Sequence, residues 1–271
     1  MWKYTKSIGT IERWSQECSM LFTQTAYIGI DPTAGPKSIA YAAIDGNLRL
    51  MALGIGELDE VLAFMGGQHQ AVVAINGPGN VNQGLMKSDE IREKLAIPPK
   101  PGRSDNLRLA EYLLQVRNLP IYHTPAKEEK AKPWLRLAFN LTKRLQSLGY
   151  GSEDLEMIEA SADVCYQVWL GHPLFGQRSL EGRLQRQLVL FDLGLDIPDP
   201  MMYFEEITRF RILQGVLPEE HLFNSFELQV LAIAYIAWAK NNKPEDIEVV
   251  GDEKEGQIFL PSEKAYSFNK K

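Results

Sequence analysis

The sequence predicts an α/β fold built on one mixed β-sheet, in which an antiparallel meander of three strands is followed by parallel strands, with helices on both faces. Two observations lead to this prediction. Short apolar segments at the start of the domain are joined by tight turns, and later apolar runs of strand length alternate with segments of helical periodicity. A meander followed by strand–helix alternation is typical of a single α/β domain.

Turn residues and apolar periodicity define the expected elements. The turn Pro32-Thr33-Ala34-Gly35-Pro36 ends the first strand, and Asp45-Gly46-Asn47 separates the next two. Strands are expected at 26–31, 38–44, 48–53, 71–75 and 155–159, with a closing hairpin of 247–250 and 258–260. Helices are expected at 57–65, 107–115, 127–148, 162–170, 179–193 and 225–239. The last of these is apolar almost all round, so we expect a buried core helix.

Length and composition are those of a globular protein. The chain has 271 residues, of which 45% are hydrophobic and 24% charged, so we expect a sizeable core and no extensive disorder. We expect an N-terminal extension at 1–25 and a single domain at 26–271, with a helical, basic insertion at about 98–150. The net charge of -6 argues against a protein that coats nucleic acid along its whole surface.

Missing motifs exclude several classes of protein. Cys18 and Cys165 are the only cysteines, which excludes a disulfide framework and a cysteine-based zinc site. No apolar run approaches the roughly 20 residues that cross a bilayer, and residues 1–25 do not have the pattern of a secretory signal. We therefore expect a cytoplasmic protein without a membrane partner. A dinucleotide fingerprint, a phosphate loop and a nucleophile elbow are also absent.

Three acidic residues occupy positions where acids are unusual. Asp31 and Glu159 each end an apolar strand, and Glu227 lies in the first turn of the most apolar helix. Carboxylates that converge from strand ends and a helix start can hold Mg²⁺ or Mn²⁺. A pair of such ions can activate a water molecule and stabilise the leaving oxygen in phosphodiester cleavage.

Each of these acids also has a purely structural interpretation. Asp31 before Pro32 can open a turn, and Glu159 can be a strand-end residue that faces solvent. Glu227 follows Asn224 by three residues, which fits a capping box. Spacing alone does not show that the three carboxylates meet, so both interpretations stay open.

Several short blocks resemble, in their order, a family of predicted nucleases. The segment 27–37 resembles the opening hairpin of the ribonuclease-H-like proteins gathered as domain-of-unknown-function family 429, and Met157-Ile158-Glu159-Ala160 is similar to that family's Val-Ile-Glu strand. The other similar blocks are 74–78, 103–105 with Arg108, 122–125, 179–186, 225–228 and 251–256. No single block is specific, and the resemblance depends on their order along most of the chain.

The resemblance implies a ribonuclease-H-like sheet and a catalytic site made of Asp31, Glu159 and Glu227, with Asn76 as a fourth contact. The three carboxylates would bind one or two Mg²⁺ or Mn²⁺ ions. The family's usual residue at position 76 is Asp. The amide of Asn76 keeps an oxygen but removes a negative charge, which weakens the binding of a hard cation. Weak, altered and lost catalysis are therefore all open.

Basic residues are the candidates for substrate binding. Lys and Arg outnumber Asp and Glu in residues 100–150, although the whole chain is acidic. A phosphodiester substrate beside an acidic metal site requires such basic groups. The candidates are Lys37, Arg103, Arg108, Arg183 and Arg186. The alternative interpretation is an ordinary solvated surface.

The leading hypothesis from the sequence is a metal-dependent nuclease that hydrolyses phosphodiester bonds of nucleic acid. A catalytically reduced nucleic-acid-binding or scaffolding protein on the same fold is the alternative, favoured by Asn76 and by the acidic total charge. A third hypothesis is an actin-like ATPase or sugar kinase. It ranks last because the turn after Asp31 carries its threonine and glycine in the wrong order for that class.

Overall fold

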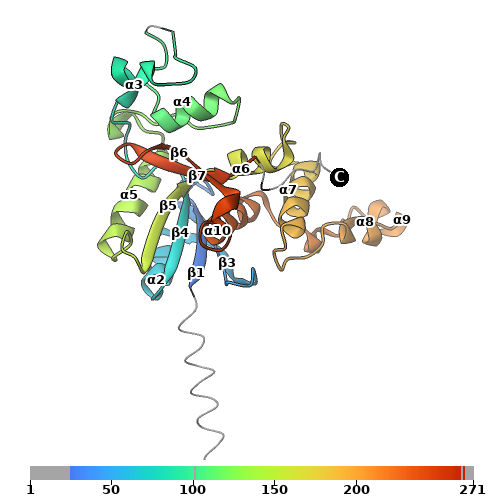
Figure 1. Cartoon of the computed structure of the whole chain (residues 1–271). Helices are drawn as coiled ribbons and strands as arrows, with labels where there is room; N and C mark the ends of the chain where they lie inside the picture. The colour runs from blue at the N-terminus through green and yellow to red at the C-terminus, as the bar shows by residue number, and fades with distance from the viewer. Residues whose placement is uncertain (1–24, 101, 264, 266–271) are drawn as a thin grey trace, which may run out of the picture.

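The computed structural model describes residues 25–100, 102–263 and 265. They form a seven-stranded mixed sheet in the order β3-β2-β1-β4-β5-β7-β6, with helices on both faces (Figure 1). The strands are β1 (Ala26–Asp31), β2 (Ser38–Ile44), β3 (Leu50–Glu57), β4 (Ala71–Asn76), β5 (Leu155–Ala160), β6 (Ile247–Asp252) and β7 (Gly256–Pro261). The longer helices are α2 (Leu58–Gly66), α4 (Leu109–Val116), α5 (Pro133–Ser147), α6 (Ala162–Leu170), α7 (Leu180–Asp192) and α10 (Ser225–Asn242). The predicted α/β class with a mixed sheet is confirmed, and the extension at 1–25 lies outside the described residues except for Thr25.

The predicted antiparallel meander is formed by β1, β2 and β3. The third strand begins at Leu50 instead of Leu48, because a tight turn occupies the preceding residues. In that turn the carboxylate of Asp45 accepts hydrogen bonds from the backbone N–H groups of Asn47 and Arg49, at 2.8 and 2.9 Å. Leu48 adopts a φ of 63°, which is a turn conformation and not a strand conformation.

The second half of the sheet is mostly parallel. β4 pairs with β1, β5 with β4 and β7 with β5, all in parallel, and β6 completes the predicted hairpin with β7. The carboxyl ends of β1, β4 and β5 therefore meet at one edge of the sheet. Asp31, Asn76 and Glu159 lie at or beside these ends, and Glu159 is in register with Ile75 of the neighbouring strand.

The sheet separates two apolar cores. Ile28 and Ile30 of β1 pack on the face covered by α2 and α5, and Tyr27 packs on the face covered by α10, α6 and α7. The alternation follows from the two-residue period of a strand. α10 is buried on all sides along most of its length, as predicted.

The prediction that no apolar segment approaches the length needed to cross a bilayer is wrong for one helix. The helical stretch Glu219–Asn242, which includes α10, is long and apolar enough to cross a bilayer by length and composition. However, 78% of its most apolar window is buried inside this chain, as in the core helix of a soluble protein.

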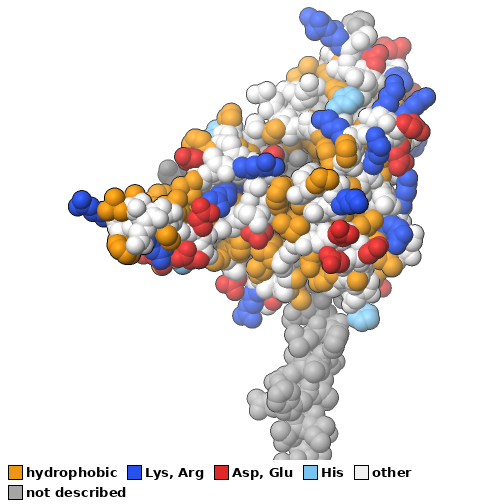
Figure 2. Space-filling model, turned by 180° about the vertical axis from the view of Figure 1, so that it is seen from behind, with side chains coloured by type: hydrophobic (Ala, Val, Ile, Leu, Met, Phe, Trp, Pro, Cys, Tyr) orange, Lys and Arg blue, Asp and Glu red, His pale blue; other side chains and the backbone are white. Residues whose placement is uncertain are grey.

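The connection between β4 and β5 holds the predicted helical insertion, with α4, α5 and the short helix α3 (Asp89–Glu93). The predicted helix at 127–148 begins only at Pro133, where the missing N–H of proline is tolerated in the first helical turn. Lys and Arg side chains lie along this side of the molecule with acidic side chains among them (Figure 2).

Residues 199–218 form an arm that projects from the sheet (Figure 1). It carries two short helices, α8 (Met202–Glu206) and α9 (Arg209–Leu213). Apolar side chains are exposed along it, with Phe210 68% and Leu213 77% exposed (Figure 2).

α10 crosses β1 in close contact at Gly29. A Cβ atom on Gly29 would lie 2.0 Å from the carbonyl oxygen of Val230 and 2.8 Å from the backbone nitrogen of Ala234. Both atoms belong to the backbone of α10, so a side chain at position 29 cannot be accommodated by a change of rotamer. The helix and the strand therefore touch through their backbones, and only glycine fits between them.

We expect Gly29→Ala to destabilise the fold by about 3 kcal/mol or more, because the added methyl group forces α10 away from the sheet. Gly66→Ala is the matched control, since a Cβ atom on Gly66 would meet nothing within 4 Å and the residue is helical. The control should change the free energy of unfolding by less than about 1 kcal/mol. Urea denaturation of both variants measures this difference, and equal midpoints would contradict the close-packing argument.

Candidate functional site

Asp31 is a fully buried carboxylate at the carboxyl end of β1. Its Oδ1 accepts a hydrogen bond from the backbone N–H of Thr33 at 3.0 Å, and its Oδ2 accepts one from the Thr33 hydroxyl at 2.9 Å. The turn interpretation of Asp31 is thus confirmed. Burial raises the pKa of this carboxyl from 3.8 to about 6, although the bonds from Thr33 and the amide of Asn76 lower it. The nearby charge of Asp163 contributes to the raised pKa.

Asn76 supports Asp31 as a hydrogen-bond donor. Its Oδ1 accepts a hydrogen bond from the backbone N–H of Ala162 at 3.3 Å. A backbone N–H can only donate, so the oxygen of the amide must face Ala162 and the NH₂ group is left for Asp31. An aspartate at this position would place a second negative charge beside Asp31 instead. Asn76 therefore favours the ionised form of Asp31 without adding charge.

Asp163 is the second carboxylate of the site, and it was not predicted from the sequence. It lies in the first turn of α6, just after β5. Its Oδ1 accepts hydrogen bonds from Nε2 of Gln229 at 2.9 Å and from the guanidinium of Arg186 at 3.2 Å. Within the described residues both bonds fall on this one oxygen. The side chain is 42% exposed, so Oδ2 is available to a ligand.

A pocket of about 320 Å³ lies at the carboxyl end of the parallel strands, and Asn76 and Asp163 line it, whereas the buried Asp31 lies behind its partners Thr33 and Asn76. Its lining residues are Thr33, Asn76, Pro120, Ile121, Tyr122, Trp134, Ser161, Asp163, Gln177 and Gln229. Gln229 projects from α10 and is only 2% exposed. Its Oε1 has no hydrogen-bond partner in the described part of the chain. A buried amide oxygen without a partner is costly, and a ligand or a water molecule in the pocket would satisfy it.

Glu159 does not line this pocket and is bound by Arg108 instead. The guanidinium of Arg108 holds it in a bidentate ion pair, with NH1 2.9 Å from Oε2 and NH2 2.5 Å from Oε1. The hydroxyl of Tyr122 donates a third hydrogen bond to Oε1 at 2.6 Å. Arg108 itself is fully buried and also pairs with Glu111, Nε to Oε1, at 3.0 Å. Both oxygens of the expected metal ligand Glu159 are thus bound by an internal cation, and we assign it a structural role.

Glu227 forms the capping box that was the alternative interpretation. Its Oε2 accepts a hydrogen bond from the backbone N–H of Asn224 at 2.7 Å. The side chain of Asn224 in turn accepts hydrogen bonds from the N–H groups of Phe226 and Glu227, at 2.9 and 3.0 Å. Glu227 does not line the pocket that holds Asp163. Its position in the first turn of α10 is explained by satisfying the helix start.

The five predicted substrate-binding residues do not form one surface. Arg108 is buried in its ion pairs, and Arg186 is 2% exposed and positions Asp163. Neither can reach a phosphate in solvent, which corrects the prediction for these two. Arg183 pairs with Glu219 at 3.3 Å, while Lys37 and Arg103 are exposed.

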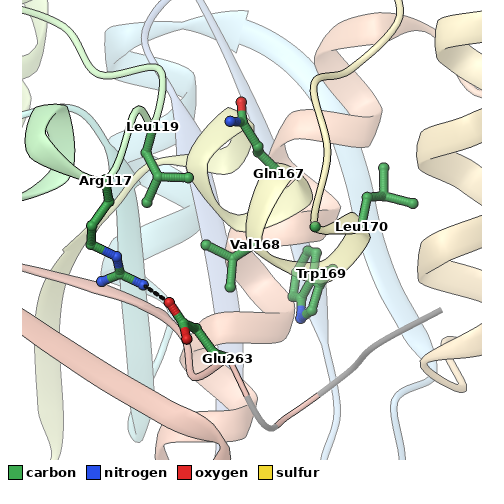
Figure 3. A pocket seen from close by; sticks show the side chains of 8 residues that line it. Arg117, Leu119, Gln167, Val168, Trp169, Leu170 and Glu263 are labelled. Carbon is green, nitrogen blue, oxygen red and sulfur yellow. Dashed lines mark hydrogen bonds and ion pairs between the residues drawn. The ribbon is translucent and has the colours of Figure 1, made fainter. Parts of the chain in front are cut away.

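Two other features of the described residues are explained without a ligand. The oxygen and nitrogen atoms of Glu206, Glu220 and His221 lie within 4.8 Å of one another, but Arg211 pairs with both glutamates at 3.4 and 3.1 Å. The cation already present there makes this group an ion-pair network. A second pocket of about 320 Å³ lies beside α6, where Arg117 and Glu263 pair across its rim at 3.4 Å (Figure 3).

The chain matches no protein-family model, and no curated protein matches it by sequence. The assignment of function therefore depends on the geometry of the site.

We expect Asp31 to make stability depend on pH in a metal-free buffer containing EDTA. Its folded pKa of about 6 lies above the ordinary 3.8, so the folded state holds the proton more tightly than the unfolded state. The contribution of Asp31 is therefore most favourable below pH 4 and is lost as the pH rises to about 6. Asp31→Asn should be more stable than the parent at pH 7 by up to about 3 kcal/mol.

Chemical denaturation of the parent and of Asp31→Asn between pH 4 and pH 8 measures this difference. Glu90→Gln, in an exposed pair with Lys94, is the control and should show no comparable trend. A difference between the parent and Asp31→Asn that stays constant across this range would contradict the buried, ionisable state of Asp31.

We expect Arg108→Met to destabilise the fold by about 3–5 kcal/mol, because it leaves Glu159 and Glu111 buried without their cation. Lys143→Met removes an exposed pair with Glu128 and should cost less than about 1 kcal/mol. Thermal and urea unfolding of the two variants compare the two ion pairs directly. Equal losses would show that the Arg108 network is no more important than a surface pair.

Proposed function

We propose that this chain is a metal-dependent phosphodiester hydrolase of ribonuclease-H-like type, with Asp31 and Asp163 as its carboxylate pair. One observation carries the proposal. Asp163 and the unpartnered amide oxygen of the buried Gln229 line one pocket, and so do Thr33 and Asn76, the two hydrogen-bond partners of the buried Asp31. The pocket lies at the carboxyl end of the parallel strands, where ligands bind in open α/β sheets.

The sheet order supports the choice of fold family. In β3-β2-β1-β4-β5, three antiparallel strands are followed by two parallel ones, with helices on both faces. This is the arrangement expected of a ribonuclease-H-like sheet, and the β6–β7 hairpin extends it. The resemblance of the short sequence blocks to the predicted nucleases points in the same direction. The described chain has this one sheet, which favours the hydrolase over a two-domain actin-like ATPase.

The oxygen donors of Asp163 and Gln229 in the pocket and of Asp31 beside it fit Mg²⁺ or Mn²⁺. Carboxylate oxygens of Asp31 and Asp163 and the amide oxygen of Gln229 are hard oxygen ligands, which these cations prefer. Such an ion, when bound, supplies Lewis-acid stabilisation of a phosphoryl oxygen. It would also offset the cost of ionising the buried Asp31, whose protein partners are neutral donors.

The surrounding residues orient the carboxylates. Thr33 fixes both oxygens of Asp31 through one backbone and one hydroxyl hydrogen bond. Arg186 and Gln229 hold Asp163 by Oδ1 alone, so its other oxygen stays available to a ligand. Locked rotamers of this kind are what a catalytic site requires from its supporting residues.

Asn76 supports a second candidate function, a catalytically reduced nucleic-acid-binding protein on the same fold. Its amide uses the oxygen for Ala162 and lowers the pKa of Asp31, so position 76 contributes no negative charge to a bound cation. A site with two carboxylates binds a hard divalent cation more weakly than one with four. Metal titration separates the two candidates.

We expect the purified protein to cleave DNA or RNA in the presence of Mn²⁺. Asp31→Asn and Asp163→Asn should each reduce the rate by roughly 100-fold or more, because each removes a proposed ligand. Glu227→Gln is the matched control and should stay within about threefold, since its carboxylate only caps α10. Gel assays with single-stranded, duplex and branched substrates measure the rates.

Calorimetry with Mn²⁺ tests the site independently of turnover. The parent should bind the ion and Asp163→Asn should bind it more weakly, by roughly 10-fold or more. No heat of binding at millimolar Mn²⁺ would overturn the metal-dependent hydrolase and favour the reduced binding protein.

A further inference from the structure

Aromatic and apolar side chains form part of the lining of the pocket, together with the carboxylate of Asp163. Tyr122 and Trp134 meet edge to face, with ring centroids 5.4 Å apart and an interplanar angle of 75°. Ile121 and Pro120 belong to the same part of the lining. The hydroxyl of Tyr122 is tied to Glu159 at 2.6 Å, so its ring is held in place and supports that of Trp134. The pocket that holds Asp163 and Gln229 therefore also offers a preformed flat contact.

The same pocket is lined by several polar groups that lack hydrogen-bond partners among the described residues. Within the described residues, the hydroxyl of Ser161, the amide of Gln177 and the indole N–H of Trp134 make no hydrogen bond, in addition to Oε1 of Gln229. A pocket with an aromatic wall and several free donors and acceptors fits a flat ring with polar edges. Its volume of about 320 Å³ is small for a binding pocket, which limits the ligand to one such ring with its immediate attachments.

Backbone phosphate contacts alone do not explain how this protein would hold a nucleic acid. Arg108 and Arg186 are internal, Arg183 is paired with Glu219, and the chain carries a net charge of -6. No Lys or Arg side chain is among the described residues that line the pocket, so contacts to the bases must supply more of the affinity there, and stacking on an aromatic side chain is the sequence-tolerant way to do so.

We infer that the pocket binds an unpaired nucleobase of a single-stranded nucleic acid, stacked on Trp134 with its polar edge toward Ser161 and Gln177. The inference rests on the proposed function for its choice of nucleic acid as the ligand. In a duplex the faces of a base are covered by its neighbours and its pairing edge by its partner, so only an unpaired or extruded base can enter. Single strands of DNA and of RNA share this chemistry.

The test is a binding measurement by fluorescence anisotropy in EDTA, which prevents metal-dependent cleavage. Labelled DNA and RNA single strands are compared with a duplex and with an abasic strand that keeps its phosphates. The parent should bind both single strands at least about 5-fold more tightly than the duplex or the abasic strand. Whether DNA or RNA binds more tightly identifies the natural source of the base.

Trp134→Ala should weaken single-strand binding by roughly 5- to 100-fold and leave abasic-strand binding unchanged. Trp134→Phe keeps a ring and should stay within about threefold of the parent. Phe210→Ala removes an aromatic side chain from the exposed arm, far from the lining of the pocket, and should have no effect. The affinities for the base-containing and the abasic strand are compared using the parent protein, so this part of the test does not require the variants to fold.

Equal affinity of the parent for single-stranded, duplex and abasic probes would overturn the inference. So would unchanged binding in a folded Trp134→Ala variant. If Asp31→Asn abolishes cleavage but Trp134→Ala leaves single-strand binding unchanged, the base-binding inference is wrong and the proposed hydrolase function is supported. If Trp134→Ala weakens single-strand binding but the parent does not cleave nucleic acid with Mn²⁺, the proposed hydrolase function is wrong and the base-binding inference is supported.

Discussion

The close contact between Gly29 and the backbone of α10 determines the geometry of the candidate site. Gly29 precedes Asp31 by two residues on β1, and its contacts on α10 are the neighbours of Gln229. Contact between the two backbones therefore sets how near the side chain of Gln229 comes to the end of the strand. From there Gln229 holds Asp163, which is how residues from the turn after β1, from α6 and from α10 reach one pocket. A larger residue at position 29 would separate these elements by more than a hydrogen bond can tolerate.

The carboxylates near this edge of the sheet divide into two electrostatic classes. Glu159 and Glu111 share the buried guanidinium of Arg108, so each of these carboxylates has a cation as a direct partner within the protein. Asp31 is equally buried but receives hydrogen bonds only from neutral groups, and burial raises its pKa to about 6. A buried charge without a cation costs free energy in the folded state, and such a cost is commonly found at functional sites. This contrast is the physical basis for assigning structure to Glu159 and function to Asp31.

Most of the fold followed from local patterns, whereas the site depended on contacts that the sequence does not encode locally. The strands at 26–31, 38–44 and 155–160 and the hairpin at the end of the domain agree with apolar runs and turn residues. The sequence singles out Asp31 because an acid at the end of an apolar strand is conspicuous, and the structure shows that its carboxylate is buried. Asp163 was not predicted, because acidic residues are common in the first turn of a helix, where the helix dipole stabilises a negative charge. Nothing in the spacing of Arg108 and Glu159 revealed their pairing, since the two are separated by the whole of α4 and α5.

The pocket is assembled from parts of the chain that are synthesised at very different times. Thr33 and Asn76 come early, Tyr122 and Trp134 belong to the insertion, and Gln229 comes from the penultimate part of the domain. During translation from the N-terminus the pocket therefore lacks Gln229 until α10 has been made and has docked on Gly29. Completion of the pocket thus coincides with completion of the fold, and a chain that ends before α10 would have neither.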